Sequence, residues 1–206
     1  MRGSQRAASM KEIAKGIHTW SVFSEEKGLA FNGWYLQTGG SAFLIDPPPM
    51  NEGQAAVLAK LPRPGMILIT NKDHLRGAVG IRKQYWSQVL VHDQDLVALG
   101  CPVDGTFSDG DLLLGSMEVL HLPHGKSPGE CAFYWPGGKA LVLGDALIGR
   151  PEGELSLLPD EKLADPAAFR AALRKLLERD VECVLVGDGT PILQDARGAL
   201  ERAIGG

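Results

Sequence analysis

The sequence predicts an α/β protein in which two β-rich halves pack face to face and helices cover their outer faces. Short apolar runs with the pattern of strands gather in two stretches of the chain, residues 17–45 and 112–143. Segments with helical spacing follow each stretch. Because a sheet must bury its apolar face against another layer, this order favours a pair of sheets between helices.

In the first half, apolar runs separated by turn residues predict strands at residues 17–23, 33–37, 42–45, 66–69 and 89–91. The segment Thr38-Gly39-Gly40-Ser41 is typical of a hairpin turn. A helix is predicted at residues 54–61, because Pro62 would end it there. A second helix is predicted at residues 75–85, where apolar positions recur at helical spacing.

In the second half, strands are predicted at residues 112–114, 117–122, 131–135, 140–143 and 181–186. Pro136-Gly137-Gly138 forms the expected turn between the third and fourth of these runs. Asp165 followed by Pro166 indicates a helix start, with the aspartate as N-cap and the proline as the first helical residue. A final amphipathic helix is predicted at residues 192–204.

The composition limits the classes of partner. The 206-residue chain is 44% hydrophobic and 22% charged, which is typical of a globular protein with a full core. Its formal net charge is −4 and no basic stripe is present, which argues against a nucleic-acid or anionic membrane partner. No apolar run approaches the roughly 20 residues that cross a bilayer. A small-molecule substrate or ligand is the expected partner, and the oligomeric state stays open.

The N-terminal residues lack the apolar stretch of a secretory signal. Residues 1–16 are expected to form an arm before a single domain at residues 17–206, and a vector-derived leader before Met10 is one alternative. Three cysteines, Cys101, Cys131 and Cys183, match no zinc-binding or redox spacing. Reduced, buried thiols and a cytoplasmic location are therefore expected.

Polar residues follow the predicted strands at the positions where α/β proteins bind ligands. Four such positions are Asp46, the segment Asn71-Lys72-Asp73-His74, Asp145 and Asp188. A fifth polar cluster, residues 124–130, lies in the loop after a strand. Glycines beside Asp145 and Asp188 allow the backbone to turn sharply, so these carboxylates are expected to meet in one cleft.

Five segments in order resemble the motifs of the metallo-β-lactamase-like superfamily. LITNKDHLRGA resembles its Thr-His-x-His-x-Asp-His-x-Gly-Gly signature, and HGKSPGE resembles its Gly-His-Thr-Pro-Gly loop. LVLGDAL resembles its Gly-Asp metal-bridging motif, VLVGDGTP its closing Gly-His-Gly motif, and LIDPP a strand end near its N-terminus. The resemblance runs from about Trp20 to the end of the chain and implies a four-layer αββα sandwich.

The same segments depart from the superfamily at its metal ligands. If Asp73-His74 is aligned with its Asp-His pair, Ile69 and Asn71 stand where its first two histidines belong. If Thr70 is aligned with its threonine, Asn71 and Asp73 stand there, and Arg76 stands at the third histidine. The His-x-His pair is absent in both registers.

The remaining ligand positions are also altered. Lys126 replaces the loop histidine and Asp188 replaces the last histidine, whereas Asp145 is unchanged. The first register therefore implies one divalent ion, Mn²⁺, Fe²⁺ or Zn²⁺. Its expected ligands are Asp73, His74, Asp145 and Asp188.

Clustered carboxylates need a compensating positive charge, and the sequence offers an alternative to the metal. The ammonium of Lys126, together with Arg76, could neutralise the aspartates in place of an ion. Because a protonated lysine is not a metal ligand, the presence of Lys126 at a ligand position argues against a normal dinuclear centre.

Two functions follow from these alternatives. In a metal-dependent hydrolase, the ion would activate water against an ester, thioester, lactone or phosphodiester. Asp73 and Lys126 would be catalytic, and Lys126, Arg76 and His124 would bind the substrate. The other function is that of a non-catalytic scaffold or small-molecule binding protein that has lost the metal, and the fold alone does not decide between them.

Overall fold

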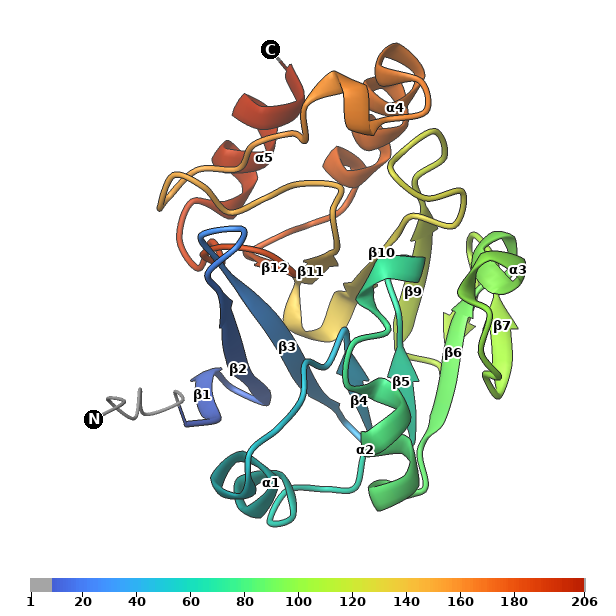
Figure 1. The fold of residues 1–206 in the computed structure, drawn as a ribbon. Helices are drawn as coiled ribbons and strands as arrows, with labels where there is room; N and C mark the ends of the chain where they lie inside the picture. The colour runs from blue at the N-terminus through green and yellow to red at the C-terminus, as the bar shows by residue number, and fades with distance from the viewer. Residues whose placement is uncertain (1–8, 206) are drawn as a thin grey trace.

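Two β-sheets form the centre of the protein, and helices cover both outer faces (Figure 1). The computed structural model describes residues 9–205, and within them the first sheet has seven strands in chain order. These are β1 (Lys11–Ala14), β2 (Ile17–Ser24), β3 (Leu29–Thr38), β4 (Ser41–Ile45), β5 (Met66–Leu68), β6 (Gln88–His92) and β7 (Gly105–Phe107). Strands β1 to β4 are antiparallel to their neighbours, and β4 to β7 are parallel.

The second sheet has five strands within the same residues, in the order β12-β11-β10-β9-β8. They are β8 (Leu112–Leu113), β9 (Met117–His121), β10 (Cys131–Trp135), β11 (Ala140–Leu143) and β12 (Cys183–Val186). Strands β8 to β11 are antiparallel to their neighbours, whereas β11 and β12 are parallel.

The helices lie on the outer faces of the two sheets (Figure 1). Helices α1 (Glu52–Leu58) and α2 (Ala78–Tyr85) cover the first sheet, α4 (Pro166–Leu173) and α5 (Ala196–Gly205) cover the second, and α3 (Leu96–Leu99) follows β6. Short 3₁₀ turns occur at η1 (Lys72–His74), η2 (Asp93–Asp95), η3 (Pro136–Gly138), η4 (Asp160–Lys162) and η5 (Arg174–Glu178). In the described part of the chain, every helix is too short or too polar to cross a membrane.

Three buried apolar clusters fill the spaces between the four layers. One lies between the sheets, one between the first sheet and α1 and α2, and one between the second sheet and α4 and α5. In strand β4, alternate side chains point to opposite faces of the sheet. Phe43 and Ile45 enter the cluster between the sheets, and Ala42 and Leu44 enter the cluster beneath α1 and α2. The predicted four-layer α/β sandwich is confirmed.

The predicted N-terminal arm extends too far into the chain. Lys11–Ala14 forms β1, in which Lys11 pairs with Thr19 and Glu12 with His18, and Met10 is buried. The boundary at residue 16 is therefore wrong. It was missed because β1 is a short, mostly exposed edge strand without apolar alternation. The rest of the predicted arm, residues 1–8, lies outside the described residues.

Two predicted helices begin later than their apolar spacing indicates. The helix expected from residue 75 starts at Ala78, because Arg76 has a left-handed backbone with φ 38°. The helix expected from residue 192 starts at Ala196, because Ile192 pairs with Val184 as an isolated bridge of the second sheet. Strand β7 was not predicted, since three residues carry too little periodicity.

The two sheets are tied together at the ends of their strands. The amide N–H of Asn32 in β3 donates to the carbonyl of Gly187 after β12 (2.8 Å), and the indole of Trp34 donates to the carbonyl of Val186 (3.2 Å). The amide of Cys131 in β10 donates to the carbonyl of Thr70 after β5 (2.9 Å). The polar residues that follow β4, β5, β11 and β12 consequently meet at one end of the sandwich.

Candidate functional site

The site is built around His74, which the tight turn η1 directs inward immediately after β5. The carboxylate of Asp46 accepts hydrogen bonds from the amide and hydroxyl of Thr70 (2.9 and 2.5 Å) and lies 2.8 Å from His74 Nδ1. The other ring nitrogen, Nε2, lies 3.5 Å from Asp145 Oδ1. Asp46, Thr70 and His74 are all buried, so Asp46 fixes the orientation of the imidazole toward Asp145.

Lys126 joins two of the predicted site carboxylates. Its Nζ lies 2.7 Å from Asp145 Oδ2 and 2.9 Å from Asp73 Oδ2. The side chain of Asp145 is 5% exposed, and that of Asp73 is 40% exposed and also pairs with Lys72. Lys126 therefore balances one buried and one exposed carboxylate at the same time.

Arg76 performs the corresponding role for Asp188. Its Nη2 lies 2.6 Å from Asp188 Oδ1 and 3.0 Å from His74 Nε2. Its Nη1 donates to the carbonyls of Asn32 (3.3 Å) and Gly187 (3.4 Å), and the guanidinium stacks over Phe31, 4.7 Å from the ring centre. The guanidinium is therefore held on several sides. We refer to the charged group formed by Asp46, Asp73, His74, Arg76, Lys126, Asp145 and Asp188 as the cluster.

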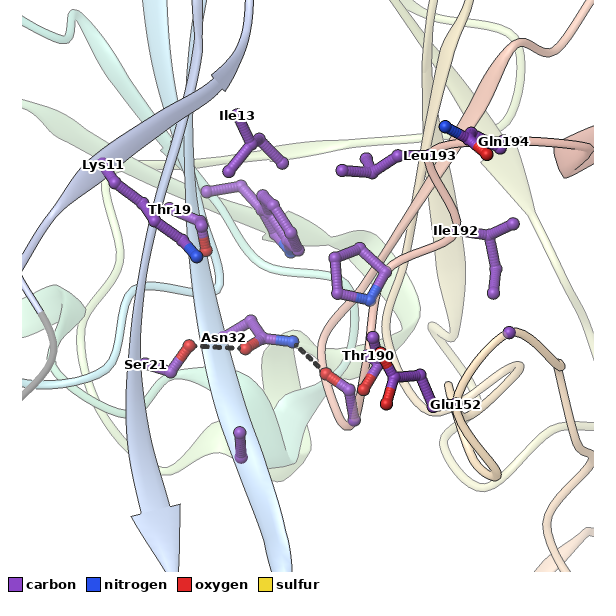
Figure 2. A pocket seen from close by; sticks show the side chains of 15 residues that line it. Lys11, Ile13, Thr19, Ser21, Asn32, Glu152, Thr190, Ile192, Leu193 and Gln194 are labelled. Atoms are coloured by element: carbon purple, nitrogen blue, oxygen red, sulfur yellow. Dashed lines mark hydrogen bonds between the residues drawn. The ribbon is translucent and has the colours of Figure 1, made fainter.

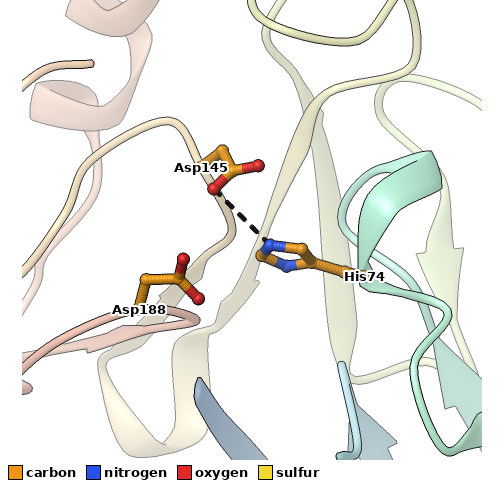
Figure 3. A group of neighbouring side chains, drawn as sticks. All are labelled: His74, Asp145 and Asp188. Carbon is orange, nitrogen blue, oxygen red and sulfur yellow. Dashed lines mark ion pairs between the residues drawn. The ribbon is translucent and has the colours of Figure 1, made fainter. Parts of the chain in front are cut away.

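His74, Asp145 and Asp188 form a group with the geometry of a metal-ligand set (Figure 3). One ligand atom from each residue lies within 4.8 Å of the others, and all three residues are buried. Asp73, the fourth expected ligand, is not in this group. The structure thus brings three of the four predicted ligands together.

The pKa shifts of Asp145, Lys126 and His74 reflect their pairing with groups of opposite charge. Burial opposes ionisation of Asp145, but His74 and Lys126 hold its pKa well below the usual range. Burial opposes protonation of Lys126 as well, yet Asp145 and Asp73 raise its pKa. Burial likewise lowers the pKa of His74, but Asp46 and Asp145 outweigh it and raise the pKa to about 10. The charges of the cluster balance one another.

Glu130 is a buried acid of the site that the sequence analysis did not assign. It is fully buried, its Oε1 accepts from Asn71 Nδ2 (3.3 Å), and its Oε2 has no partner within the described residues. Burial and the nearby charge of Asp145 raise its pKa well above 4.5, so it is held neutral. A charged residue directly before the apolar strand β10 was the available signal.

Replacing Glu130 with glutamine is expected to raise the free energy of unfolding at pH 7 and leave it unchanged near pH 4. A raised native-state pKa costs stability as the pH rises above the unfolded-state value of about 4.5, because the unfolded chain then ionises and the native one does not. The neutral amide removes that cost. Urea denaturation at both pH values measures the effect, and an equal gain at both would contradict a protonated Glu130.

Two glycines permit the close packing of the site. A Cβ at Gly144 would lie 2.2 Å from Thr70 Oγ1, and a Cβ at Gly187 would lie 2.8 Å from His74 Cε1. Any side chain at these positions would displace the Asp46–Thr70–His74 network. These glycines belong to the Gly-Asp segments noted in the sequence.

A pocket of about 310 Å³ opens over the cluster. Asp73, His74, Arg76, Lys126, Asp145 and Asp188 all line it, together with Lys27, Lys162 and the apolar side chains of Leu29, Phe31, Ile148, Leu158 and Pro159. The expected convergence of distant polar residues in one pocket is therefore present.

A larger pocket of about 540 Å³ lies beside β1 to β3 and the segment 189–194 (Figure 2). Its wall includes Asn32, whose side chain accepts from Ser21 Oγ (2.7 Å) and donates to the carbonyl of Gly189 (2.8 Å). Because the backbone carbonyl of Asn32 also accepts from Arg76, this residue separates the two pockets. The larger pocket contains no histidine or cysteine among its lining residues.

His124 is not among the residues that line the pocket over the cluster. Its backbone has a left-handed φ of 69°, and its carbonyl accepts hydrogen bonds from the amides of Ala164 and Asp165 at the start of α4. The side chain is exposed. The structure therefore gives His124 a role in loop geometry and does not place it as a ligand-binding residue.

The position of the segment LITNKDHLRGA in the structure favours the register in which Thr70 is aligned with the threonine of the superfamily signature. The alternative puts Ile69 at the first ligand position, but Ile69 is buried in the apolar cluster beneath α1 and α2. In the Thr70 register, the altered positions Asp73 and Lys126 contact each other, and the altered positions Arg76 and Asp188 do the same. Each pair thus combines a cation and an anion where the superfamily places histidines.

The chain belongs to the metallo-beta-lactamase superfamily, because the sequence model of that family matches residues 10–204. A comparison with curated proteins gives no match.

Solved structures support the same fold. The metallo-beta-lactamase from Pontibacter korlensis is 19% identical with a TM-score of 0.74, covering 96% of this chain and 97% of that one. The metallo-beta-lactamase from Hirschia baltica is 15% identical with a TM-score of 0.74, covering 95% of each. A metallo-beta-lactamase family protein from Thermus thermophilus is 20% identical with a TM-score of 0.66, covering 93% of this chain and 79% of that one.

Proposed function

We propose that this protein binds a small molecule in the pocket over the cluster, and that it does so without a divalent metal ion. The observation that carries the proposal is the position of Arg76, whose guanidinium lies between His74 and Asp188. Two fixed cations, Arg76 and Lys126, then supply the positive charge that an ion would otherwise supply.

The residues do not fit a metal ion as they are arranged. An ion bound by His74 and Asp188 would lie about 2.0–2.2 Å from Nε2 and from a carboxylate oxygen. Arg76 Nη2 lies 3.0 Å from that Nε2 and 2.6 Å from Asp188 Oδ1, so the guanidinium fills the space within reach of both atoms. A divalent cation beside a guanidinium would also be repelled by it.

Lys126 makes the other half of the cluster equally unsuited to an ion. Its ammonium contacts Asp145 and Asp73 directly, at 2.7 and 2.9 Å. Metal binding there would require Lys126 to lose its proton or leave both carboxylates, and these carboxylates raise its pKa. In this proposal, Lys126 and Arg76 hold the charge of the bound molecule, and Asp73 positions Lys126.

The cluster also lacks an accessible hydroxyl or thiol nucleophile, which favours binding over hydrolysis through such a group. The hydroxyl of Thr70 lies 3.1 Å from His74 Nδ1, but it donates to Asp46 and is fully buried. Among the residues lining the pocket there is no serine, threonine or cysteine. The pocket lining therefore has no side-chain hydroxyl or thiol to accept an acyl group.

A metal-dependent hydrolase is the second candidate, and the spacing of the ligand atoms of His74, Asp145 and Asp188 within 4.8 Å favours it. In this candidate, Arg76 would leave Asp188 and Mn²⁺, Fe²⁺ or Zn²⁺ would bind in its place. The ion would supply an activated water to the substrate.

Elemental analysis of protein expressed in medium supplemented with Mn²⁺, Fe²⁺ and Zn²⁺ distinguishes the two candidates. We expect substoichiometric metal and a thermal unfolding midpoint that EDTA does not change, because a tightly bound ion would stabilise the native state. One equivalent of metal, with a midpoint that falls on chelation, would refute the metal-independent proposal and support the hydrolase.

A further inference from the structure

We infer that the ligand of the pocket over the cluster is a small monocarboxylate with an apolar tail. The inference rests on the proposed metal-independent site. The pocket is positively charged, whereas the chain as a whole is negatively charged, with 25 acidic and 21 basic side chains. The lining residues include four lysine and arginine side chains and three aspartates, and His74 is paired with the buried Asp46. A locally positive pocket on an acidic protein selects for an anion.

Three ammonium groups are available to the anion. Lys126 has three N–H donors and uses two of them on Asp73 and Asp145, and its side chain is 33% exposed. The side chain of Lys162 makes no hydrogen bond or ion pair with any residue that the structure describes, and Lys27 makes only a loose pair with Glu26 at 3.4 Å. All three lysines line the same pocket.

The fixed aspartates limit the charge of the ligand. Asp73, Asp145 and Asp188 line the pocket beside the lysines, and their three charges are matched by Lys126, Arg76 and Lys72, the last of which pairs with Asp73. The surplus positive charge therefore comes mainly from Lys27 and Lys162. Because Glu26 lies 3.4 Å from Lys27 and offsets its charge, a monocarboxylate balances the remaining ammonium of Lys162, whereas a dianion such as a phosphate monoester would leave a negative charge beside the aspartates.

The pocket is also lined by apolar side chains. These are Leu29 and Phe31 from β3, together with Ile148, Leu158 and Pro159. Each methylene that a ligand buries there favours binding, because apolar surface is removed from water. A volume of about 310 Å³ suits a short chain or a single ring rather than a long lipid.

The test is a calorimetric titration of sodium octanoate into the full-length protein in buffer containing EDTA. We expect saturable binding with one ligand per chain, an affinity that falls with added salt, and a higher thermal unfolding midpoint. Octyltrimethylammonium has the same tail and the opposite charge, and we expect no binding. Octyl phosphate at pH 8 should bind more weakly than octanoate.

Matched lysine variants locate the carboxylate. Lys162→Met is expected to weaken octanoate binding about tenfold, because it removes an unpaired ammonium from the pocket, and a tenfold change is about 1.4 kcal/mol. Lys60→Met removes an exposed lysine outside the pocket and should leave the affinity unchanged.

Three results would overturn the inference. Equal binding of octanoate and octyltrimethylammonium would refute the charge selection, and unchanged affinity in Lys162→Met would refute the site. Absence of octanoate binding with and without zinc would refute the ligand class and leave the metal-independent site intact. Octanoate binding only when zinc is present would overturn the proposed function itself.

Discussion

Arg76→Met is expected to lower the free energy of unfolding by about 3 kcal/mol at pH 8, because it leaves a buried carboxylate without its counter-ion. The side chains of Arg76 and Asp188 are only 10% and 12% exposed, so water screens the remaining charge poorly. The variant also loses the hydrogen bonds from the guanidinium to the carbonyls of Asn32 and Gly187. Burial raises the pKa of Asp188, so the unpaired acid can take up a proton and the loss should be smaller at pH 5.

Urea denaturation at both pH values measures this effect. The double variant R76M/D188N removes the unpaired charge together with the arginine, and we expect it to recover most of the lost stability. If the single variant Arg76→Met were as stable as the parent at pH 8, Arg76 would not be the counter-ion of the cluster.

Lys126→Met is expected to cost about 2 kcal/mol of unfolding free energy at pH 7, less than a fully buried pair because Lys126 is 33% exposed. Most of this destabilisation arises because Asp145 loses a counter-ion, and its side chain is only 5% exposed. Lys126 helps to hold the native-state pKa of Asp145 below the ordinary value of 3.8. The stabilisation is therefore present above pH 3.8 and is lost as the pH falls through the lower native-state pKa, so the parent and the variant should converge in acid.

Lys72→Met is the matched control for this prediction. The ammonium of Lys72 pairs with Asp73, whose side chain is 40% exposed, and forms no ion pair with the buried Asp145 within the described residues. We expect a loss of about 0.5 kcal/mol or less. Similar losses in the two variants at pH 7 would contradict a special role for Lys126.

The layered architecture could be predicted because the sequence repeats one physical pattern in every central strand. In β4, β11 and β12, alternate side chains enter different apolar clusters, so each strand reads as apolar on both faces. The edge strands β1 and β7 could not be predicted, because they lack this apolar pattern. The strand Lys11–Ala14 is mostly exposed, and its place in the sheet depends on pairing with β2, which local spacing does not encode.

The members of the site could be predicted, but their partners could not. Strand ends and glycines placed His74, Asp145 and Asp188 in one pocket, and the structure brings them together. The sequence could not show that Arg76 turns toward Asp188, because this depends on a left-handed backbone at Arg76 itself. It also could not separate the two registers, because the burial of Ile69 in an apolar cluster depends on the tertiary fold.

Glu130 illustrates a second limit. An acid in a glycine-rich loop is most often solvated, and its position directly before an apolar strand does not by itself establish full burial. Only the tertiary fold buries it and brings Asp145 close, and both effects raise its pKa, whereas the hydrogen bond from Asn71 opposes the shift.

Calorimetric titration of Zn²⁺ and Mn²⁺ into the parent protein and into Arg76→Ala tests the central claim most directly. The claim is that fixed side-chain cations occupy the place of a metal among His74, Asp145 and Asp188. We expect no stoichiometric binding to the parent, and measurable binding of one ion to the variant, in which the ligand atoms are exposed to the ion. Tight binding of one ion to the parent, with no gain in the variant, would contradict the account.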